Sequence, residues 1–440
     1  MAGGTFTSYN KVRAGVYIRF TTSAPTSLTV GERGVVAICE PLSWGPIGVV
    51  NAIDANTDLV PLTGYSYGDS HLQFLTEMFK GTNRTPGPSR VLLFRPAASS
   101  SAKAAVTTGN LTATAAYDGT RGNDITIKIT SNLDSTFTVE TIVDGTVVDA
   151  QIGTTVASLT DNAWVKFTGS GNLAATAGSA LTGGANGTVA AANHSAFLTA
   201  IEPYDFDIIA YDGTDATTAA AYIAFIKRIA DENGQYAQLV IANQAADSRF
   251  VINVVSGATL ADGTSLTANQ VVWWVAGAQA GARYNESLTF AQYPGAVACT
   301  AFTNAQYVTN LNAGKFMLVG DESIIKVESD INSLVSVSTD IGSVYKKNRI
   351  MRLCNTIAND IYTQFSEFIG AVNNDEDGRS RFKGAIVGYL LDIEAGGGIQ
   401  NFDPDDVTVE AGPTIDSIII TVAIQVIDSV EKIYLTVEVS

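Results

Sequence analysis

The sequence contains only two histidines, His71 and His194, so a serine or cysteine nucleophile that needs an imidazole base must use one of them. One serine, Ser66, lies in a G-x-S-x-G pattern at residues 64–68. In hydrolases this pattern forms a nucleophile elbow, in which a strand leads into the serine and a helix begins directly after it. A serine hydrolase that uses Ser66 with His71 or His194 is therefore one chemical hypothesis for this chain.

The residues around Ser66 do not favour the elbow. Pro61 interrupts the strand that should precede the serine, because proline cannot donate a main-chain hydrogen bond to a sheet. Gly68 delays the start of the next helix to Asp69. We expect a loop in which Asp69 or Ser70 caps the helix, and no catalytic residue; the hydrolase remains the less favoured alternative.

Metal and cofactor patterns are incomplete. Residues 373–378 (NNDEDG) resemble the start of a calcium-binding EF loop, but its twelfth position, normally glutamate, is Gly384. We expect an acidic turn between two helices there. The Gly-rich stretches LTGGANGT and EAGGGI lack the GK[ST] ending of a phosphate-binding loop. The cysteines have no CxxC spacing: Cys39, Cys299 and Cys354. We predict no metal and no cofactor.

The composition excludes several classes of partner. The chain has 440 residues, 46% of them hydrophobic and 16% charged, which suits about three domains. Its 26 Lys and Arg against 43 Asp and Glu leave a net charge of −17, which argues against binding to nucleic acid or anionic membranes. The N-terminus lacks the apolar core of a secretory signal, and no stretch approaches the ~18 apolar residues of a membrane span. We expect a soluble protein made in a cytoplasm.

Two parts of the chain alternate between strand and helix patterns, which predicts a largely parallel sheet with helices on its faces. The helical pair Trp273-Trp274 is expected to pack into a core or a subunit interface. The predicted strands are residues 35–40, 90–95, 206–211, 237–242 and 315–319, and the predicted helices are residues 69–80, 215–233, 268–282 and 304–312.

Residues 97–187 differ in amino-acid composition and pattern from the parts of the chain on either side. Thr, Gly, Ala, Ser and Asp dominate, and the runs ITIKI, TFTVETIV and VVDAQI alternate as strands do. The pair Asp144-Gly145 between two of these runs is a strong hairpin signal. We predict an inserted antiparallel β domain.

The last hundred residues change pattern again. Ile350 to Phe368 keeps helical spacing and predicts the longest helix of the chain, followed by a second helix over residues 379–393. Residues 417–427 and 432–439 are predicted strands, and the second of them alternates strictly. Like the short alternating run over residues 16–20, it has no obvious partner nearby in the sequence.

One cluster of basic residues, called the basic cluster below, lies near the start of the predicted long helix in this acidic chain. It comprises Lys346, Lys347, Arg349 and Arg352. The two interpretations are a solvated helix start and a contact with an acidic protein partner.

Four stretches occur in this order along the chain: KVRAGVYIRF, AAYDGTRGNDITIKI, FTNAQYVTNLNAGKFMLV and EKIYLTVEV. Together they resemble the tail sheath proteins of contractile bacteriophage tails and related phage-tail-like particles. KVRAGVYIRF is similar to the family's N-terminal arm, which commonly reads RPGVY; Ala14 replaces the usual proline, so the arm's starting geometry stays open. AAYDGTRGNDITIKI is similar to the start of the inserted β domain, FTNAQYVTNLNAGKFMLV to the core helix-turn-strand, and EKIYLTVEV to the closing strand. The stretches are scattered over most of the chain and keep the family's order.

The resemblance implies an α/β core domain with an inserted antiparallel β domain, an α+β C-terminal domain and extended terminal strand arms. The N-terminal arm would be residues 1–20, the core residues 21–96 and 188–344, the outward-facing inserted domain residues 97–187, and the C-terminal domain, ending in a strand arm, residues 345–440. Sheath subunits stack as hexameric rings around an inner tube and contract to drive it through a bacterial envelope.

The resemblance also implies partners and a location. The partners would be other copies of the chain, the inner tail tube protein, and the baseplate and tail terminator proteins, without nucleic acid or membrane insertion. The protein would belong to a virion tail or phage-tail-like particle assembled in the host bacterial cytoplasm, with a structural and not an enzymatic role. Another self-assembling virion or surface protein, such as a capsid or tube component, stays an alternative.

In the family, arms of neighbouring subunits add strands to a sheet in another subunit's C-terminal domain, which satisfies exposed main-chain groups. The matching residues here are Val16, Tyr17, Ile18, Phe20, Ile433, Tyr434, Leu435 and Val437. A helical part of the C-terminal domain faces the inner tube, and Lys346, Lys347 and Arg349 would be the matching residues. Removing residues 1–20, or truncating after Ser429, should therefore leave a folded chain that no longer polymerises.

Overall fold

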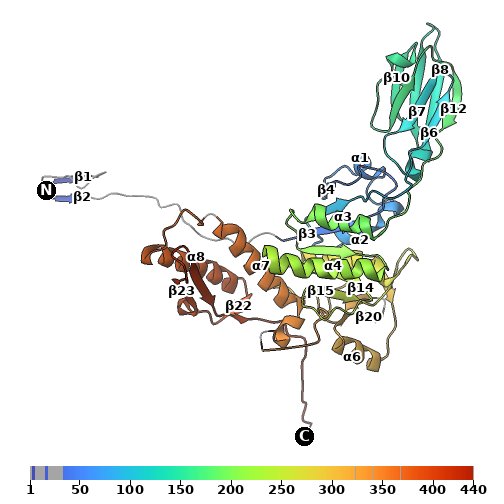
Figure 1. Cartoon of the computed structure of the whole chain (residues 1–440). Helices are drawn as coiled ribbons and strands as arrows, with labels where there is room; N and C mark the ends of the chain where they lie inside the picture. Colours follow the sequence, from blue (N-terminus) through green and yellow to red (C-terminus); the bar gives the residue numbers. More distant parts are fainter. Residues whose placement is uncertain are drawn as a thin grey trace. The chain divides into compact units, whose positions relative to one another are not determined.

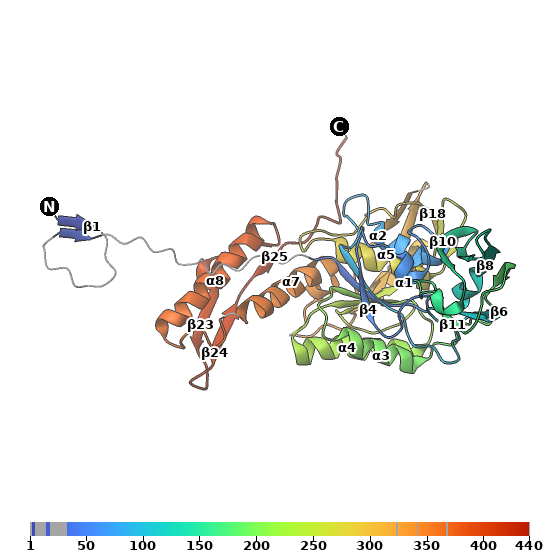
Figure 2. The same cartoon turned by 90° about the horizontal axis from the view of Figure 1, so that it is seen from above.

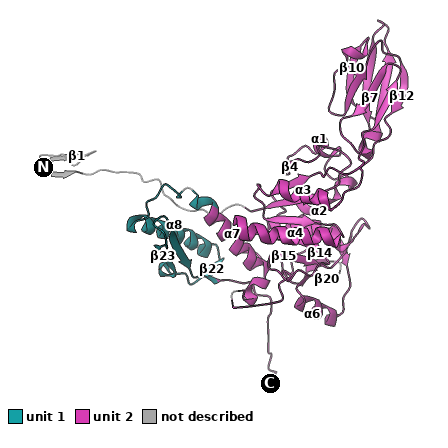
Figure 3. Ribbon diagram, in the orientation of Figure 1, with its two compact units in different colours: residues 1–30, 363–425 teal, residues 31–362, 426–440 magenta. Residues whose placement is uncertain are grey.

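The computed structural model describes residues 2–4, 15–17, 33–322, 324–339, 341–366 and 368–439. Contacts divide the chain into two compact units (Figure 3). The central unit contains residues 33–362 and 426–439, and the other, here called the C-terminal unit, contains residues 363–425 together with the described residues 2–4 and 15–17. The chain thus leaves the central unit near residue 362 and returns to it at residue 426.

A seven-stranded sheet in the order β19-β15-β14-β13-β3-β5-β4 forms the middle of the central unit. All neighbouring strands are parallel except β4, which runs antiparallel to β5. Most residues of these strands are apolar, as expected for a sheet with helices on both faces. Their bounds are β3 Val35–Cys39, β4 Val50–Ile53, β5 Arg90–Phe94, β13 Ile208–Tyr211, β14 Gln238–Ala242, β15 Val251–Val254 and β19 Lys315–Phe316.

Alternate residues of each strand face opposite helical layers. In β3, Val36 and Ile38 join the apolar cluster that includes α2 (Gln73–Phe79) and α5 (Ala268–Gly281). Ala37 and Cys39 join the second cluster, with α3 (Ala191–Ile201) and α4 (Ala216–Arg228). Figure 2 shows these two helix pairs on opposite sides of the strands. The predicted α/β layering is confirmed for the central unit.

Helix α5 carries the tryptophan pair into the core. Thr267 and Gln270 form a capping box at its N-terminus, which satisfies main-chain N–H groups that have no helical partner. Trp274 is fully buried and stacks on Tyr293, with ring centroids 4.1 Å apart. The Nε1 of Trp273 donates to Oδ2 of Asp212 at 2.8 Å. Core packing of the pair is confirmed.

Smaller elements complete the central unit, and the sequence patterns missed most of them. The predicted helix at residues 69–80 is a 3-10 turn, Ser70–Leu72, followed by α2, and Asp69 caps the turn as expected. The other elements are α1 Val60–Thr63, a π turn Ile229–Asn233, β16 Ala258–Leu260, β17 Ser265–Leu266, β18 Ala296–Cys299, α6 Asn304–Asn312, β20 Leu318–Asp321, β21 Ile324–Val327 and a 3-10 turn Ser343–Lys346.

Seven antiparallel strands follow β5 and form two sheets, in the orders β10-β9-β8-β12 and β11-β7-β6 (Figure 1, teal). The β9–β10 hairpin turns at Asp144 and Gly145, both with positive φ, as the sequence predicted. The sheets enclose an apolar cluster of their own, to which Trp44 contributes from outside the strands. The bounds are β6 Ala105–Thr108, β7 Leu111–Ala115, β8 Ile125–Ser131, β9 Phe137–Val143, β10 Thr146–Gly153, β11 Val165–Gly169 and β12 Thr176–Ala180.

The C-terminal unit packs a helix against short strands. Helix α7 (Asn348–Phe365) has 18 residues, most of them in the central unit, and α8 (Glu376–Ala395) has 20. The prediction that the first helix is the longest is wrong, because the Asp375 cap starts α8 three residues earlier than its apolar pattern indicates. The strands are β22 Ile399–Gln400, β23 Val407–Ala411, β24 Ile418–Val422 and β25 Gln425–Val426, paired as β22-β25 and β23-β24.

The predicted terminal strands have different outcomes. Residues 432–439 are not paired as a strand in the single chain, which supplies them no hydrogen-bonded neighbour, so their pairing with another subunit stays a prediction. At the N-terminus, β1 (Ala2–Gly4) pairs in parallel with β2 (Gly15–Tyr17), which contains Val16 and Tyr17. Ile18 and Phe20 lie outside the described residues. Among the described residues, none of the helices has both the length and the apolar composition that crossing a membrane requires.

Candidate assembly site

The structure does not assemble Ser66 into a nucleophile elbow. Helix α1, not a strand, precedes it and ends at Gly64. The Nδ1 of His71 lies 2.8 Å from Oδ1 of Asp69. His194 lies in α3, where its Nδ1 is 3.0 Å from the hydroxyl of Tyr222, and burial lowers its pKa. The two histidines therefore serve local contacts in separate helical layers.

The acidic turn at residues 373–378 caps a helix. Asp375 accepts from the main-chain N–H of Gly378 at 2.8 Å, at the first turn of α8. The amide of Asn374 donates to the main-chain oxygens of Ile415 and Ser417. In the parts of the chain that the structure describes, no group of three or more His, Cys, Asp or Glu side chains is placed to hold a metal ion.

The interpretation of the basic cluster as an exposed surface is wrong for its two arginines. Arg352 is 0% exposed and Arg349 is 7% exposed, whereas Lys346 and Lys347 are half-buried. The start of α7 packs inside the central unit, and the two arginines, three residues apart, share its inward face. Tube contact by Lys346, Lys347 and Arg349 stays a prediction.

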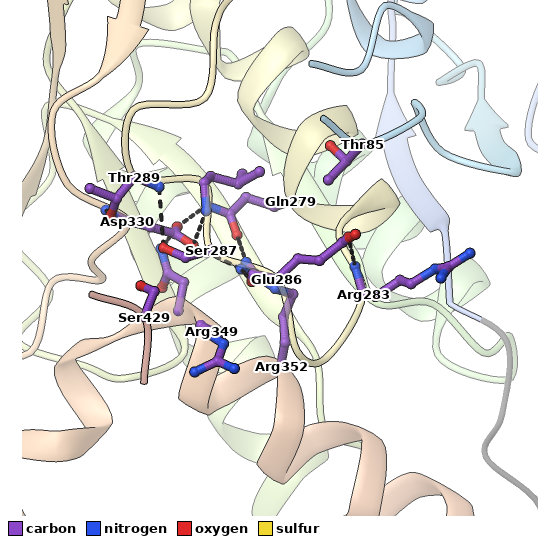
Figure 4. A network of polar contacts seen from close by, with 12 residues as sticks. Thr85, Gln279, Arg283, Glu286, Ser287, Thr289, Asp330, Arg349, Arg352 and Ser429 are labelled. Atoms are coloured by element: carbon purple, nitrogen blue, oxygen red, sulfur yellow. Dashed lines mark hydrogen bonds and ion pairs between the residues drawn. The ribbon is translucent and has the colours of Figure 1, made fainter. Parts of the chain in front are cut away.

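Arg352 pairs with Asp330 in a fully buried polar network (Figure 4). Its Nη2 lies 2.8 Å from Oδ2 of Asp330, whose carboxylate also accepts from Gln279, Asn348 and the main-chain N–H of Leu288. Burial alone would raise the pKa of Asp330, but the charge of Arg352 and these hydrogen bonds outweigh it and leave the pKa below its ordinary value. The network therefore holds a carboxylate ionised inside the central unit.

The chain segment after β25 returns to this network. We name residues 427–431 the arm root and residues 432–439 the arm. Nη1 of Arg349 donates to the main-chain oxygen of Ile427, and Nζ of Lys347 binds the carboxylate of Glu431. The hydroxyl of Thr289 donates to the other oxygen of Glu431 at 2.8 Å. Both ends of the root are thus attached to the central unit.

A cavity of about 420 Å³ lies beside the arm root. Its lining mixes polar and apolar side chains, and the root forms one wall. The lining residues are Arg84, Thr85, Glu286, Ser287, Thr289, Phe290, Ser429, Val430, Glu431 and Ile433. The root is therefore seated on the central unit without filling the space next to it.

The predicted arm residues are strongly exposed in the single chain. Ile433 and Leu435 are 85% and 82% exposed, and Tyr434 and Val437 are similarly uncovered. In the C-terminal unit, β23 and β24 form a two-stranded sheet, so within the described residues both of its outer edges lack a strand partner. The sequence pattern found the arm but missed Glu431 and Thr289, because nothing local links Glu431 to Lys347, 84 residues away.

A pair of acidic residues lies at the carboxyl ends of β3 and β13, where the strand order of the central sheet reverses. Glu40 and Asp212 are the residues directly after these strands. Burial and the neighbouring Asp212 raise the pKa of Glu40 far above its ordinary value, and burial raises that of Asp212. Oε1 of Glu40 has no hydrogen-bond partner among the described residues. Burial and the neighbouring carboxyl group therefore favour the neutral form of Glu40.

Replacing Glu40 with glutamine should stabilise the protein increasingly as the pH rises. Because the folded-state pKa is raised, the wild-type contribution is fully present below the ordinary value of 4.5 and is lost as the pH rises through the folded-state value. Over that window the wild type loses about 1.4 kcal/mol per pH unit relative to the variant. Urea unfolding between pH 5 and pH 8 measures the difference, with the exposed Glu438→Gln as control. A difference independent of pH would contradict the assignment.

Comparisons with known proteins bear on the whole chain. Three family models match: the phage tail sheath protein beta-sandwich domain at residues 97–186, the phage tail sheath protein central domain at residues 187–333, and the phage tail sheath C-terminal domain at residues 340–440. The phage-like element PBSX protein XkdK of Bacillus subtilis is 36% identical over the full length of both chains.

Solved structures agree with the sequence comparisons. The sheath tail protein from Desulfitobacterium hafniense is 41% identical, with a TM-score of 0.87 over 96% of this chain and 99% of that chain. The sheath complex of the extracellular contractile injection system PVC, in its contracted state, shares the fold at 13% identity, with a TM-score of 0.58 over 98% of each chain. The chain therefore belongs to the phage tail sheath protein family.

Proposed function

We propose that this chain is a structural subunit of a contractile tail sheath, which polymerises as stacked rings around an inner tube and contracts to drive the tube through a bacterial envelope. Family membership supports the structural role, and the fold shared with a contracted injection-system sheath supports contraction. A structural role requires neither a catalytic residue nor a cofactor. The sheath would form part of a virion tail or phage-tail-like particle assembled in the bacterial cytoplasm.

The observation that carries this proposal is the exposed, alternating arm. Isoleucine, leucine and two valines occupy every second position of residues 433–439 and are uncovered in the single chain. An exposed alternating segment of this kind gains main-chain hydrogen bonds and side-chain burial when it is added to the edge of another sheet. The open edges of β23 and β24 offer such a sheet in every subunit.

The proposed partners are other copies of the chain and the remaining tail proteins. Arms from neighbouring copies would link subunits within and between hexameric rings, with Val16, Tyr17, Ile18 and Phe20 acting at the N-terminal end. Each paired residue adds only about 0.2–1 kcal/mol, but repetition over many subunits makes the lattice strong. The inner tube protein, the baseplate and the tail terminator would complete the particle. The inserted domain, residues 97–187, would face outward.

Truncation after Lys432 tests the proposal, because it removes the arm and retains the root. A cut after Ser429 would also delete Glu431 and so mix two effects. We expect the truncated chain to keep the unfolding midpoint of the wild type and to form no tubes in sedimentation and electron microscopy. The full-length Glu438→Gln variant, changed at one exposed arm position, should still polymerise. Tubes of normal diameter from the truncated chain would refute the role of the arm.

A further inference from the structure

We infer that Glu431 anchors the arm to its own central unit, so that the arm pairs with a neighbour while its root stays held. The pairing step rests on the function proposed above, but the anchor is a property of the single chain. The anchor is made of Glu431, Lys347 and Thr289.

The exposure of side chains along the root shows that its contact with the central unit ends at Glu431. Ile427, Ser429 and Glu431 are partly buried, whereas Asp428 and Val430 between them are exposed. The side chain of Glu431 is 13% exposed, and every described residue after it is exposed. The root is therefore extended with alternate side chains turned toward the central unit, and this pattern stops at Glu431.

Thr289 connects the anchor to the buried network around Asp330. The hydroxyl of Thr289, which donates to Glu431, accepts from the main-chain N–H of Asp330 at 2.9 Å. Asp330 is held in turn by Arg352 (Figure 4). A carboxylate that receives hydrogen bonds from both an ammonium and a positioned hydroxyl is bound more strongly than a surface ion pair.

The anchor determines where force on the arm is delivered. In chain order the arm follows the C-terminal unit, but its root is attached to the central unit at Ile427 and Glu431. A pull by a neighbouring subunit therefore reaches the central unit at Glu431, before it can act on β25 and the strands preceding it. The short strand pairs of the C-terminal unit are protected from that load.

Trypsin cleavage after Lys432 measures the anchor, because a protease needs several residues on both sides of the bond in an open, extended form. In the unassembled full-length chain, Lys347→Met and Thr289→Val should each speed loss of residues 433–440, followed by intact-mass spectrometry, by about tenfold. Neither substitution changes the residues next to the bond after Lys432. The control Lys166→Met, at an exposed lysine of β11, should leave the rate unchanged.

Glu431→Gln completes a double-mutant cycle with Lys347→Met. Because Glu431 neighbours the cleaved bond, its intrinsic effect on trypsin is calibrated with synthetic peptides of residues 427–440 carrying Glu or Gln. After this correction, the double variant of Lys347→Met and Glu431→Gln should be cleaved no faster than Glu431→Gln alone, because the two residues act as one contact. Additive effects would overturn the anchor.

The outcomes separate the anchor from the proposed function. Unchanged cleavage in Lys347→Met and Thr289→Val refutes the anchor, whatever the truncated chain does in assembly. Polymerisation of the chain truncated after Lys432 refutes the role of the arm, while faster cleavage in the two variants still supports the anchor.

Discussion

Replacing Arg352 with methionine is expected to lower the free energy of unfolding of the central unit by about 3–5 kcal/mol, because Asp330 then lies buried without its opposite charge. Both side chains are 0% exposed in the wild type. Urea unfolding followed by tryptophan fluorescence measures the loss. The matched control is Arg228→Met, whose partner Glu202 lies with it on the surface, and it should cost far less.

The loss should also depend on pH. In the wild type the pKa of Asp330 lies below 3.8, so its contribution is present above that value and is lost only as the pH falls through the folded-state pKa. Without Arg352, burial raises the pKa of Asp330, and the carboxylate of the variant can gain a proton on mild acidification. The deficit should be larger at pH 7 than at pH 5. Equal deficits at both values would show that lost packing, not buried charge, causes the effect.

Gly277→Ala is expected to destabilise the central unit by at least about 2 kcal/mol, although alanine is the better helix former. Gly277 lies inside α5, and a Cβ there would be 1.9 Å from the main-chain oxygen of Met78 in α2. A helix backbone cannot move aside as a flexible side chain does, so the two helices must separate. The midpoint of urea unfolding measures the loss.

Gly388→Ala is the matched control for this substitution. Gly388 is also inside a helix, α8, but it is exposed, and a Cβ there meets no described atom within 4 Å. The same change should therefore stabilise the C-terminal unit by about 0.5–1 kcal/mol. Opposite signs at the two sites would establish close helix approach as the cause. A neutral Gly277→Ala would show that α2 and α5 pack less tightly than the structure indicates.

Local sequence pattern predicted the elements whose burial repeats with the period of a strand or helix. The strand predicted at residues 35–40 is β3, Val35–Cys39, and the helix predicted at residues 268–282 is α5, Ala268–Gly281. Short strands such as β16 and β17 were missed, because two or three residues are too few to show a period. The length of α8 was underestimated because the residues that it adds at its two ends, 376–378 and 394–395, carry no apolar period.

For the candidate site, too, the sequence predicted some features and misjudged others. The alternating arm was visible in the sequence, and in the single chain it is not paired with a strand. The basic cluster was misjudged, since four neighbouring cations look alike until their partners are known. Arg352 meets Asp330, Arg349 meets Ile427 and Lys347 meets Glu431.

By itself, the sequence determined the covered parallel sheet, the segment of alternating strands between residues 97 and 187, the exposed arm and the resemblance to tail sheath proteins, because these depend on residue type and spacing over short stretches. Only the tertiary structure decided that Arg352 is a buried ion-pair partner and that Glu431 holds the arm root. Those contacts join residues 22 and 84 positions apart, and no local pattern specifies which distant charge a folded chain will bring alongside.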